Sequence, residues 1–299
     1  MIEARGLIKS FENVTALDGL NLHVNRGNIY GLVGPNGAGK STFIRHLTGI
    51  YRQDGGELKV LGEDVFENNN IKSKIASIPD EISYFPTATI EDMMKFYKSI
   101  YPTFDKERFD KLGSAFELAP NMTMRKLSKG MQKQAAFWIA MSMRPEILVL
   151  DEPVDGLDPV MRRQVWSVLM SDVAEYGTTV LVSSHNLREL EDVCDRVGIM
   201  NKGKMLIERS LAELQENIVK VQYAMPDGEE LPENIGLNVI HKSTVGRVST
   251  IIVRGDAEGT LNKLSGCHTL FADVLPLTLE EIFIYELGGE NYAVKEIIL

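Results

Sequence analysis

Short apolar runs alternate with longer amphipathic stretches through the first two thirds of the chain. Segments typical of β-strands fill most of the first sixty residues, among them "IEARGLIKSF", "TALDGLNLHV", "GNIYGLVG" and "GELKVLG". Two later runs, "ILVLDEP" and "TTVLVSS", have the nearly continuous apolar character of strands buried in a parallel sheet. Helical patterning covers residues 89–143 and Pro159–Tyr176, and it also includes "NLRELEDVCD". Strands that alternate with helices in this way predict an α/β core.

The pattern changes towards the C-terminus. "RVGIM" and "NKGKMLIE" predict a strand and a hairpin, and after Leu214 the segments "VKVQYAMP", "STIIVRG" and "HTLFADVLP" predict further strands. "TLEEIFIYELGG" predicts a helix that ends at Gly288. We therefore expect one large domain at residues 1–215 and a small β-rich accessory domain at residues 216–299.

Composition narrows the class of protein. Apolar residues make up 44% of the chain and charged residues 25%, which is ordinary for a globular protein. No run approaches the roughly 18 apolar residues of a membrane span, and "MIEARGLIKSF" has no apolar signal core, so we expect a cytoplasmic protein. The net charge is −10, with the acidic excess concentrated after Lys204, which argues against nonspecific nucleic-acid binding.

The segment "LSKGMQKQAAFWIAMSMRPE" predicts a helix with an unusually bare beginning. Ser128 is a good N-cap, and Gly130 leaves the backbone of the first turn uncovered. The apolar positions begin later, and Pro145 ends the run. A bare helix N-terminus is a favourable place for an anion.

A second anion site is predicted by "GLVGPNGAGKST". This segment follows an apolar strand, Ile29–Val33, and begins a helix, which is the setting that a phosphate-binding loop requires. Its glycines allow backbone N–H groups to converge on phosphate oxygens, Lys40 would reach the β- and γ-phosphates, and the Ser41 hydroxyl would ligate Mg²⁺. The alternative is a glycine-rich turn with an incidental lysine, which the flanking strand and helix disfavour. The predicted loop consists of Gly34, Pro35, Asn36, Gly37, Ala38, Gly39, Lys40, Ser41 and Thr42.

Two strand ends carry candidate polar groups. Asp151 and Glu152 follow the apolar residues of "ILVLDEP", and His185 follows "TTVLVSS". Ligands gather at the carboxyl ends of strands in an open α/β sheet, so these side chains are expected near the phosphate loop. Asp151 would support the Mg²⁺ shell and Glu152 would orient the attacking water. The alternatives are solvating charges at a strand end and a structural or surface histidine.

Taken in order, these motifs resemble the ATPase subunit of ABC transporters over residues 1–215. The resemblance rests on "GPNGAGKST", "LSKGMQKQ", "ILVLDEP", "DGLD" and "SSH" in that order. It implies an α/β fold: a P-loop NTPase (RecA-like) core with an antiparallel β subdomain, a helical signature subdomain at about residues 85–145, and here a small β-rich C-terminal appendage.

The resemblance also assigns roles. It makes Lys40, Glu152 and His185 the catalytic set, and it places Ser128 and Gly130 in the signature sequence. Asp158 falls in the loop that crosses between subunits. Phe11 occupies the place of the aromatic residue that stacks on adenine, with a strand-edge aromatic as the alternative.

Family likeness further implies a head-to-tail pair of ATPase domains that sandwiches two ATP molecules. The signature helix of one subunit then faces the γ-phosphate bound by the other. A single phosphate loop and a single signature mean that this chain needs a partner, either a second copy or another ABC ATPase. The resemblance implies Mg²⁺, integral-membrane permease subunits and a place on the cytoplasmic face of the membrane. Candidates for the permease groove are aromatic residues that could equally be subdomain core: Tyr84, Phe85, Phe96 and Tyr97.

Two departures from the family pattern stand out. The signature carries Lys129 and Met131 where glycine and glutamine are usual. In "SIPDEISYFP", Asp80 followed by Glu81 holds the place of the usual metal-binding glutamine, and either carboxylate could serve the metal. With the C-terminal appendage, these features resemble the exporter-type branch, and within it YtrB-like ATPases.

Two other functions stay open at this point. One is a soluble ABC-type ATPase that acts on ribosomes or DNA, which the single ATPase domain and the acidic balance disfavour. The other is a nucleotide-gated regulatory subunit that hydrolyses ATP weakly. The altered signature permits it, and the presence of Glu152 and His185 argues against it.

Overall fold

Contacts divide the chain into two compact units, residues 1–208 and 209–299. The predicted boundary between residues 215 and 216 lies outside the described part of the chain. The computed structural model describes residues 1–211, 213, 218–226, 229, 231–232, 235–282 and 284–285.

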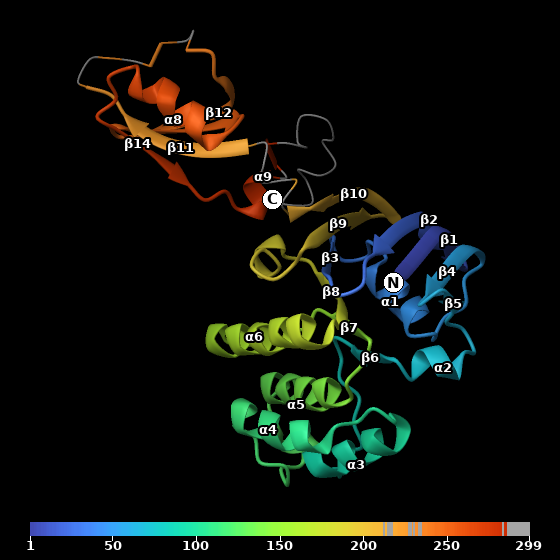
Figure 1. The fold of residues 1–299 in the computed structure, drawn as a ribbon. Coiled ribbons are helices and arrows are strands. Elements are labelled where there is room, and N and C mark those ends of the chain that lie inside the picture. The colour runs from blue at the N-terminus through green and yellow to red at the C-terminus, as the bar shows by residue number, and fades with distance from the viewer. Residues whose placement is uncertain are drawn as a thin grey trace. The chain divides into compact units, whose positions relative to one another are not determined.

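A six-stranded sheet forms the centre of the first unit (Figure 1). In spatial order its strands are β10 (Lys204–Ser210), β9 (Arg196–Asn201), β3 (Ile29–Val33), β8 (Thr179–Ser184), β7 (Ile147–Asp151) and β6 (Ile75–Ile78). All neighbours from β9 to β6 are parallel. Strands β3, β7 and β8 are buried at every position, which explains their apolar sequences. Because these strands are parallel neighbours, their carboxyl ends lie at one edge of the sheet, as the sequence predicts.

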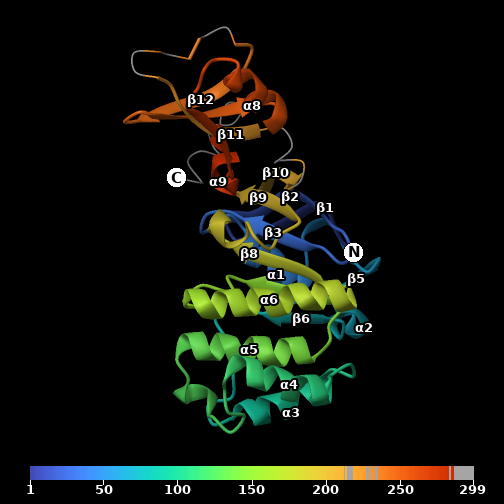
Figure 2. The same cartoon turned by 60° about the vertical axis from the view of Figure 1, so that its left-hand side comes forward.

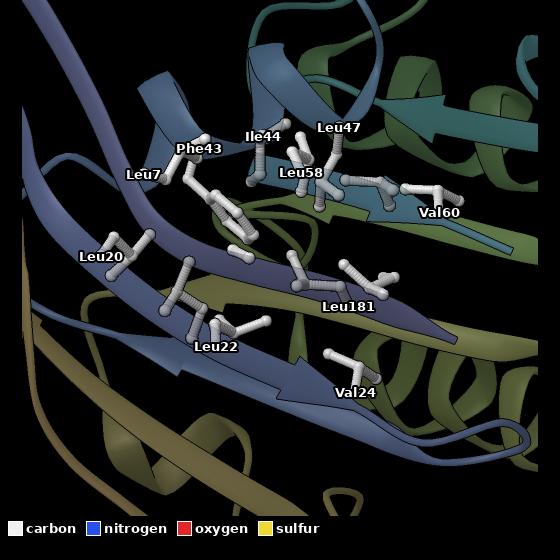
Figure 3. Close-up of a cluster of buried hydrophobic side chains, with 14 of the residues drawn as sticks. Leu7, Leu20, Leu22, Val24, Phe43, Ile44, Leu47, Leu58, Val60 and Leu181 are labelled. Atoms are coloured by element: carbon white, nitrogen blue, oxygen red, sulfur yellow. The ribbon is translucent and has the colours of Figure 1, made fainter. Parts of the chain in front are cut away.

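A four-stranded antiparallel sheet covers one side of this core. In spatial order its strands are β2 (Val14–Val24), β1 (Ile2–Phe11), β4 (Gly55–Val60) and β5 (Glu63–Asp64). Helix α1 (Lys40–Leu47) directs Phe43, Ile44 and Leu47 towards apolar side chains of this sheet and Leu181 of β8 (Figure 3). The two sheets and α1 therefore share one apolar core, which holds the N-terminus of α1 at the edge of β3.

Helices form the opposite side of the unit (Figures 1 and 2). They are α3 (Ile90–Ile100), α4 (Lys106–Phe116), the 3-10 turn η1 (Met124–Lys126), α5 (Lys129–Ser142) and α6 (Pro159–Tyr176). The short helix α2 (Asn69–Lys72) belongs to the other side, because its Ile71 packs into the apolar core that the antiparallel sheet shares with α1. Thr89 and Asp92 form a capping box that begins α3, and the Phe109 and Trp138 rings, which stack with centroids 4.3 Å apart, join α4 to α5. The helical patterning of residues 89–143 thus resolves into three helices and one short turn.

The helix predicted for "NLRELEDVCD" is wrong. Only a 3-10 turn, η2 (Leu187–Glu189), forms there, and turns follow it. The Glu189 carboxylate accepts a hydrogen bond from the Ser184 hydroxyl at 3.0 Å and pairs with Arg162 at 3.3 Å. These tertiary contacts, together with the burial of Leu190 and Cys194, outweigh local helical pattern.

The second unit contains an antiparallel sheet with one helix packed on it. In spatial order the strands are β12 (Asn238–Val245), β13 (Val248–Arg254), β11 (Ile218–Ala224) and β14 (Phe271–Leu275), and the helices are α8 (Ala257–Ser265) and α9 (Leu279–Ile282). Leu264 of α8 packs with Val221 and Ile251 in an apolar core. Strand β12 and helix α8 are not anticipated by the pattern analysis. The predicted helix end at Gly288 lies outside the described residues.

Candidate functional site

The phosphate-loop segment lies between β3 and α1. Gly39 is the N-cap of α1 and has φ of 106°, a left-handed conformation that favours glycine. A Cβ atom placed on Gly39 would lie 2.5 Å from the carbonyl oxygen of Ala16, so a side chain there would also clash. Gly39 has no side chain that could cap α1, and among the described residues no side-chain cap is formed there. Its first-turn N–H groups can therefore meet an anion.

The Lys40 ammonium group lies inside this loop. Its side chain is only 6% exposed, and Nζ donates to the carbonyl oxygens of Gly34 at 2.6 Å and Pro35 at 3.4 Å. The same Nζ lies 3.5 Å from Oε1 of Glu152. The Lys40 ammonium group thus contacts both the phosphate loop and the Glu152 carboxylate, and the sequence predicts that these two segments lie close together.

Asp151 and Glu152 are held by the neighbouring strand end. The Ser183 hydroxyl donates to Oδ1 of Asp151 at 2.5 Å and accepts from the N–H of Glu152 at 3.1 Å. Asp151 is buried at the last position of β7. Glu152 has φ of 47°, a left-handed conformation that is uncommon for a residue with a side chain. This turn of the backbone directs the two adjacent carboxylates differently.

His185 contacts Glu152 directly. Nδ1 of His185 lies 2.9 Å from Oε2 of Glu152, and the backbone N–H of His185 donates to the same oxygen at 3.3 Å. The imidazole is about half exposed. The Glu152 carboxylate thus lies between an ammonium group on one side and an imidazole on the other.

Lys133 and Ser183 are site residues that the sequence analysis did not identify. Lys133, on α5, donates from Nζ to the carbonyl oxygen of Glu152 at 2.8 Å and lies 3.5 Å from Oδ1 of Asp80. The signal available for Lys133 was a charged residue just before the apolar run of a helix. Ser183 offered no such signal, because a serine within a strand is common.

The remaining predicted residues lie on other segments. Phe11 is 38% exposed and meets the Tyr51 ring edge to face, with centroids 5.2 Å apart. Ser128 is the N-cap of α5 and accepts from the N–H of Met131 at 3.2 Å. Asp158 is the N-cap of α6 and accepts from the first-turn N–H groups. In the described part of the chain, no hydrogen bond or ion pair joins these three residues to the Lys40 and Glu152 cluster.

The signature segment and the "DGLD" segment are neighbours within this chain. A Cβ atom placed on Gly130 would lie 3.5 Å from the carbonyl oxygen of Gly156 and 3.6 Å from Cδ2 of Leu157. Both segments therefore present the N-termini of their helices, α5 and α6, on one part of the molecule.

The aromatic residues proposed for a permease groove divide into two groups. Phe85 and Phe96 are exposed and contact each other edge to face at 5.2 Å, so they are not subdomain core. Tyr97 is partly buried, which raises its pKa, and it lines a cavity of about 90 Å³. Other residues that line this cavity include Ile78, Ile82, Met93, Ile139 and Met143.

Comparisons with known proteins decide the family. A model of the ABC transporter family matches residues 17–155. The ABC transporter ATP-binding protein YtrB of Bacillus subtilis is 29% identical over 97% of this chain and 99% of its own length. An uncharacterized ABC transporter ATP-binding protein of Synechocystis sp. is 30% identical over 92% of this chain and 79% of its own length. The chain belongs to the ATP-binding proteins of ABC transporters.

A solved structure agrees with this assignment at the level of the fold. The ATP-binding subunit of an ABC transporter matches with a TM-score of 0.67 at 24% identity, over 72% of this chain and 92% of its own. The expected P-loop fold class is confirmed. As a member of the ABC ATP-binding family, the chain binds and hydrolyses ATP as a transporter subunit. Among the described residues, no helix combines the length and apolar character needed to cross a membrane.

Proposed function

We propose that this ATPase subunit hydrolyses ATP at the cluster formed by Lys40, Asp151, Glu152 and His185. The observation that carries the proposal is the position of the Glu152 carboxylate, 3.5 Å from Nζ of Lys40 and 2.9 Å from Nδ1 of His185. The carboxylate is thereby adjacent to the phosphate loop, where a γ-phosphate and its attacking water would meet it.

Each residue has a distinct part in the proposed step. The first-turn N–H groups of α1 hold phosphate oxygens, and Lys40 exchanges its loop carbonyl partners for the β- and γ-phosphates. Water attacks the γ-phosphorus and its proton passes to Glu152, while the bond to the β–γ bridging oxygen breaks and ADP leaves. His185 orients the Glu152 carboxylate and contacts the γ-phosphate region. Phe11 would stack on the adenine.

The residues present fit a magnesium ion that arrives with the nucleotide. Mg²⁺ prefers oxygen ligands and usually keeps several waters, with one or two carboxylates and the substrate phosphates. Ser41 and Asp151 supply a hydroxyl and a carboxylate, and Asp80 or Glu81 would supply another oxygen. Among the described residues no group of three or more His, Cys, Asp or Glu side chains could hold a metal alone. When bound, Mg²⁺ would neutralise phosphate charge.

The proposed partners are a second ATPase domain and a membrane permease. Ser128, Gly130 and Asp158 lie at the N-termini of α5 and α6, outside the cluster that would bind this chain's own ATP. We propose that they contact ATP held by a second copy of this chain. Residues 1–215 would act as the ATPase domain, on the cytoplasmic face of the membrane. Exposed Phe85 and Phe96 would meet the permease, and the exporter-type placement stays a prediction.

Two variants test the proposed site. Lys40→Ala is expected to lose ATP binding and hydrolysis together. Glu152→Gln is expected to bind ATP but to lower kcat by about a hundredfold or more, the range for removing a general base. Lys111→Ala is a control, because that lysine lies exposed on α4 and pairs with Glu107. The measurements are equilibrium ATP binding and steady-state phosphate release.

The outcome also separates the regulatory alternative. Wild-type turnover in both variants would contradict the proposed site. A wild-type protein that binds ATP but releases phosphate no faster than Glu152→Gln would instead indicate a nucleotide-gated regulatory subunit.

A further inference from the structure

Lys133 is a buried charge on the signature helix. It lies on α5, five positions after the N-cap Ser128, and only 7% of the residue is exposed. An ammonium group removed from water must be compensated by partners. The two partners that the structure gives it, the carbonyl oxygen of Glu152 and the carboxylate of Asp80, belong to two different loops.

The bond to Glu152 acts on a constrained stretch of backbone. Glu152 has a left-handed φ of 47°, which is unfavourable for a residue with a Cβ atom unless its surroundings hold it. Its N–H is bonded to the Ser183 hydroxyl, and its carbonyl oxygen receives the Lys133 ammonium group at 2.8 Å. A charged donor makes the stronger kind of hydrogen bond. The peptide groups on both sides of the Glu152 side chain are thus fixed.

The contact with Asp80 adds a second loop. Asp80 follows β6, whereas Glu152 follows β7, and these strands are parallel neighbours. Oδ1 of Asp80 lies 3.5 Å from Nζ of Lys133, and the Asp80 side chain is about half exposed. The Lys133 ammonium group therefore contacts both the carboxylate of Asp80 and the backbone of Glu152.

We propose that Lys133 is a positioning residue for ATP hydrolysis within its own subunit. It holds the backbone of Glu152 in the conformation that aims the carboxylate at Lys40 and His185. It also makes that conformation responsive to Asp80. The inference rests on the proposed role of Glu152, which it deepens by naming the group that maintains it.

The test compares Lys133→Met and Lys133→Gln with wild type. Methionine removes the donor while keeping an unbranched side chain, and glutamine keeps a donor but removes the charge. We expect Lys133→Met to lower kcat by about ten- to a hundredfold, the loss that corresponds to one hydrogen bond from a charged donor. ATP affinity should stay unchanged, because Lys133 does not touch the phosphate loop. Lys133→Gln should restore part of kcat.

Two controls separate positioning from a structural role. Lys111→Met makes the same change on the exposed face of α4, where it should alter neither kcat nor ATP affinity. Thermal unfolding shows whether the Lys133 variants fold. If Lys133→Met does not fold, Lys133→Gln decides, because a lowered kcat at unchanged ATP affinity supports the inference. If kcat and ATP affinity of the Lys133 variants both fall in proportion to their loss of thermal stability, the positioning role is overturned.

Coupling to Asp80 gives an independent readout. Asp80→Asn should change kcat in wild type and have a smaller effect in Lys133→Gln, since the shared charge is then gone. If the effects of Asp80→Asn and Lys133→Gln on kcat are fully additive, Asp80 does not act through Lys133 and that part of the inference is overturned. Wild-type kcat in a folded Lys133→Met would overturn the positioning role, even where Glu152→Gln abolishes hydrolysis. If Glu152→Gln also retained activity, the proposed function itself would fail.

Discussion

At the residue scale, Glu152 shows what the sequence determines and what it leaves open. The position of "DEP" after an apolar strand predicts that Asp151 and Glu152 lie at the edge where ligands gather, and the structure places Glu152 beside Lys40 and His185. The left-handed backbone of Glu152 could not be predicted from the sequence, because this conformation is normally expected only at glycine. Its support by Lys133 depends on a tertiary contact between two distant segments.

His46 carries a prediction about pH. It is almost fully buried on α1, and its Nδ1 lies 2.7 Å from the carbonyl oxygen of Thr42. Burial lowers the pKa of His46 below its ordinary value. The unfolded chain therefore binds more protons than the folded chain as pH falls towards and below about 6.5. Acidification through that range should lower the free energy of unfolding.

The measurement is thermal unfolding of wild type and His46→Leu between pH 8 and pH 5.5. The leucine variant should lose less stability over this range than wild type, whatever its stability at pH 8. Equal losses in the two proteins would show that His46 does not titrate differently in the folded and unfolded states.

At the element scale, the sequence predicts fully buried strands more reliably than short helices. Strands β3, β7 and β8 are buried on both faces, so their apolar runs were sufficient to find them. The stretch after His185 has a helical pattern but forms only η2, because Glu189 is engaged by Ser184 and Arg162. Strand β12 is largely exposed and has no apolar run to reveal it. Local pattern predicts an element best where the core enforces it.

The start of α6 offers a prediction at this scale. Asp158 accepts from the N–H groups of Val160 and Met161 at 2.9 and 3.1 Å. Asp158→Ala should lower the free energy of unfolding by about 0.5–2 kcal/mol, the range for losing an N-cap. Asp158→Asn should stay near wild type in stability, because its amide oxygen also caps. Urea denaturation measures both.

The same pair separates the two roles of Asp158. If Asp158→Asn keeps stability but lowers ATP hydrolysis, the carboxylate acts at the nucleotide site as well as at the helix. If both variants are as stable as wild type, the cap contributes nothing to folding and the account of α6 is wrong.

At the scale of the whole molecule, the order of the motifs predicted the fold better than any one of them. The phosphate loop, the signature segment and the two strand ends belong to one unit of 208 residues, and the family model matches residues 17–155 within it. The strand pairing, including the parallel order from β9 to β6, comes from long-range contacts that local sequence does not encode. The strand-like segments of the C-terminal unit predict that it is β-rich, but the sequence pattern does not predict helix α8.

The central claim at this scale is that ATP pairs two copies of the chain, with the phosphate loop of one facing the signature segment of the other. The most direct test is the solution mass of Glu152→Gln with and without Mg-ATP, because this variant should bind ATP and hydrolyse it only very slowly. We predict that the mass doubles only with ATP. Adding Gly130→Asp should abolish the doubling by placing a carboxylate against the γ-phosphate, while the Ser128 cap is retained. A Glu152→Gln protein that binds ATP and stays monomeric, or a doubling that survives Gly130→Asp, would contradict the claim.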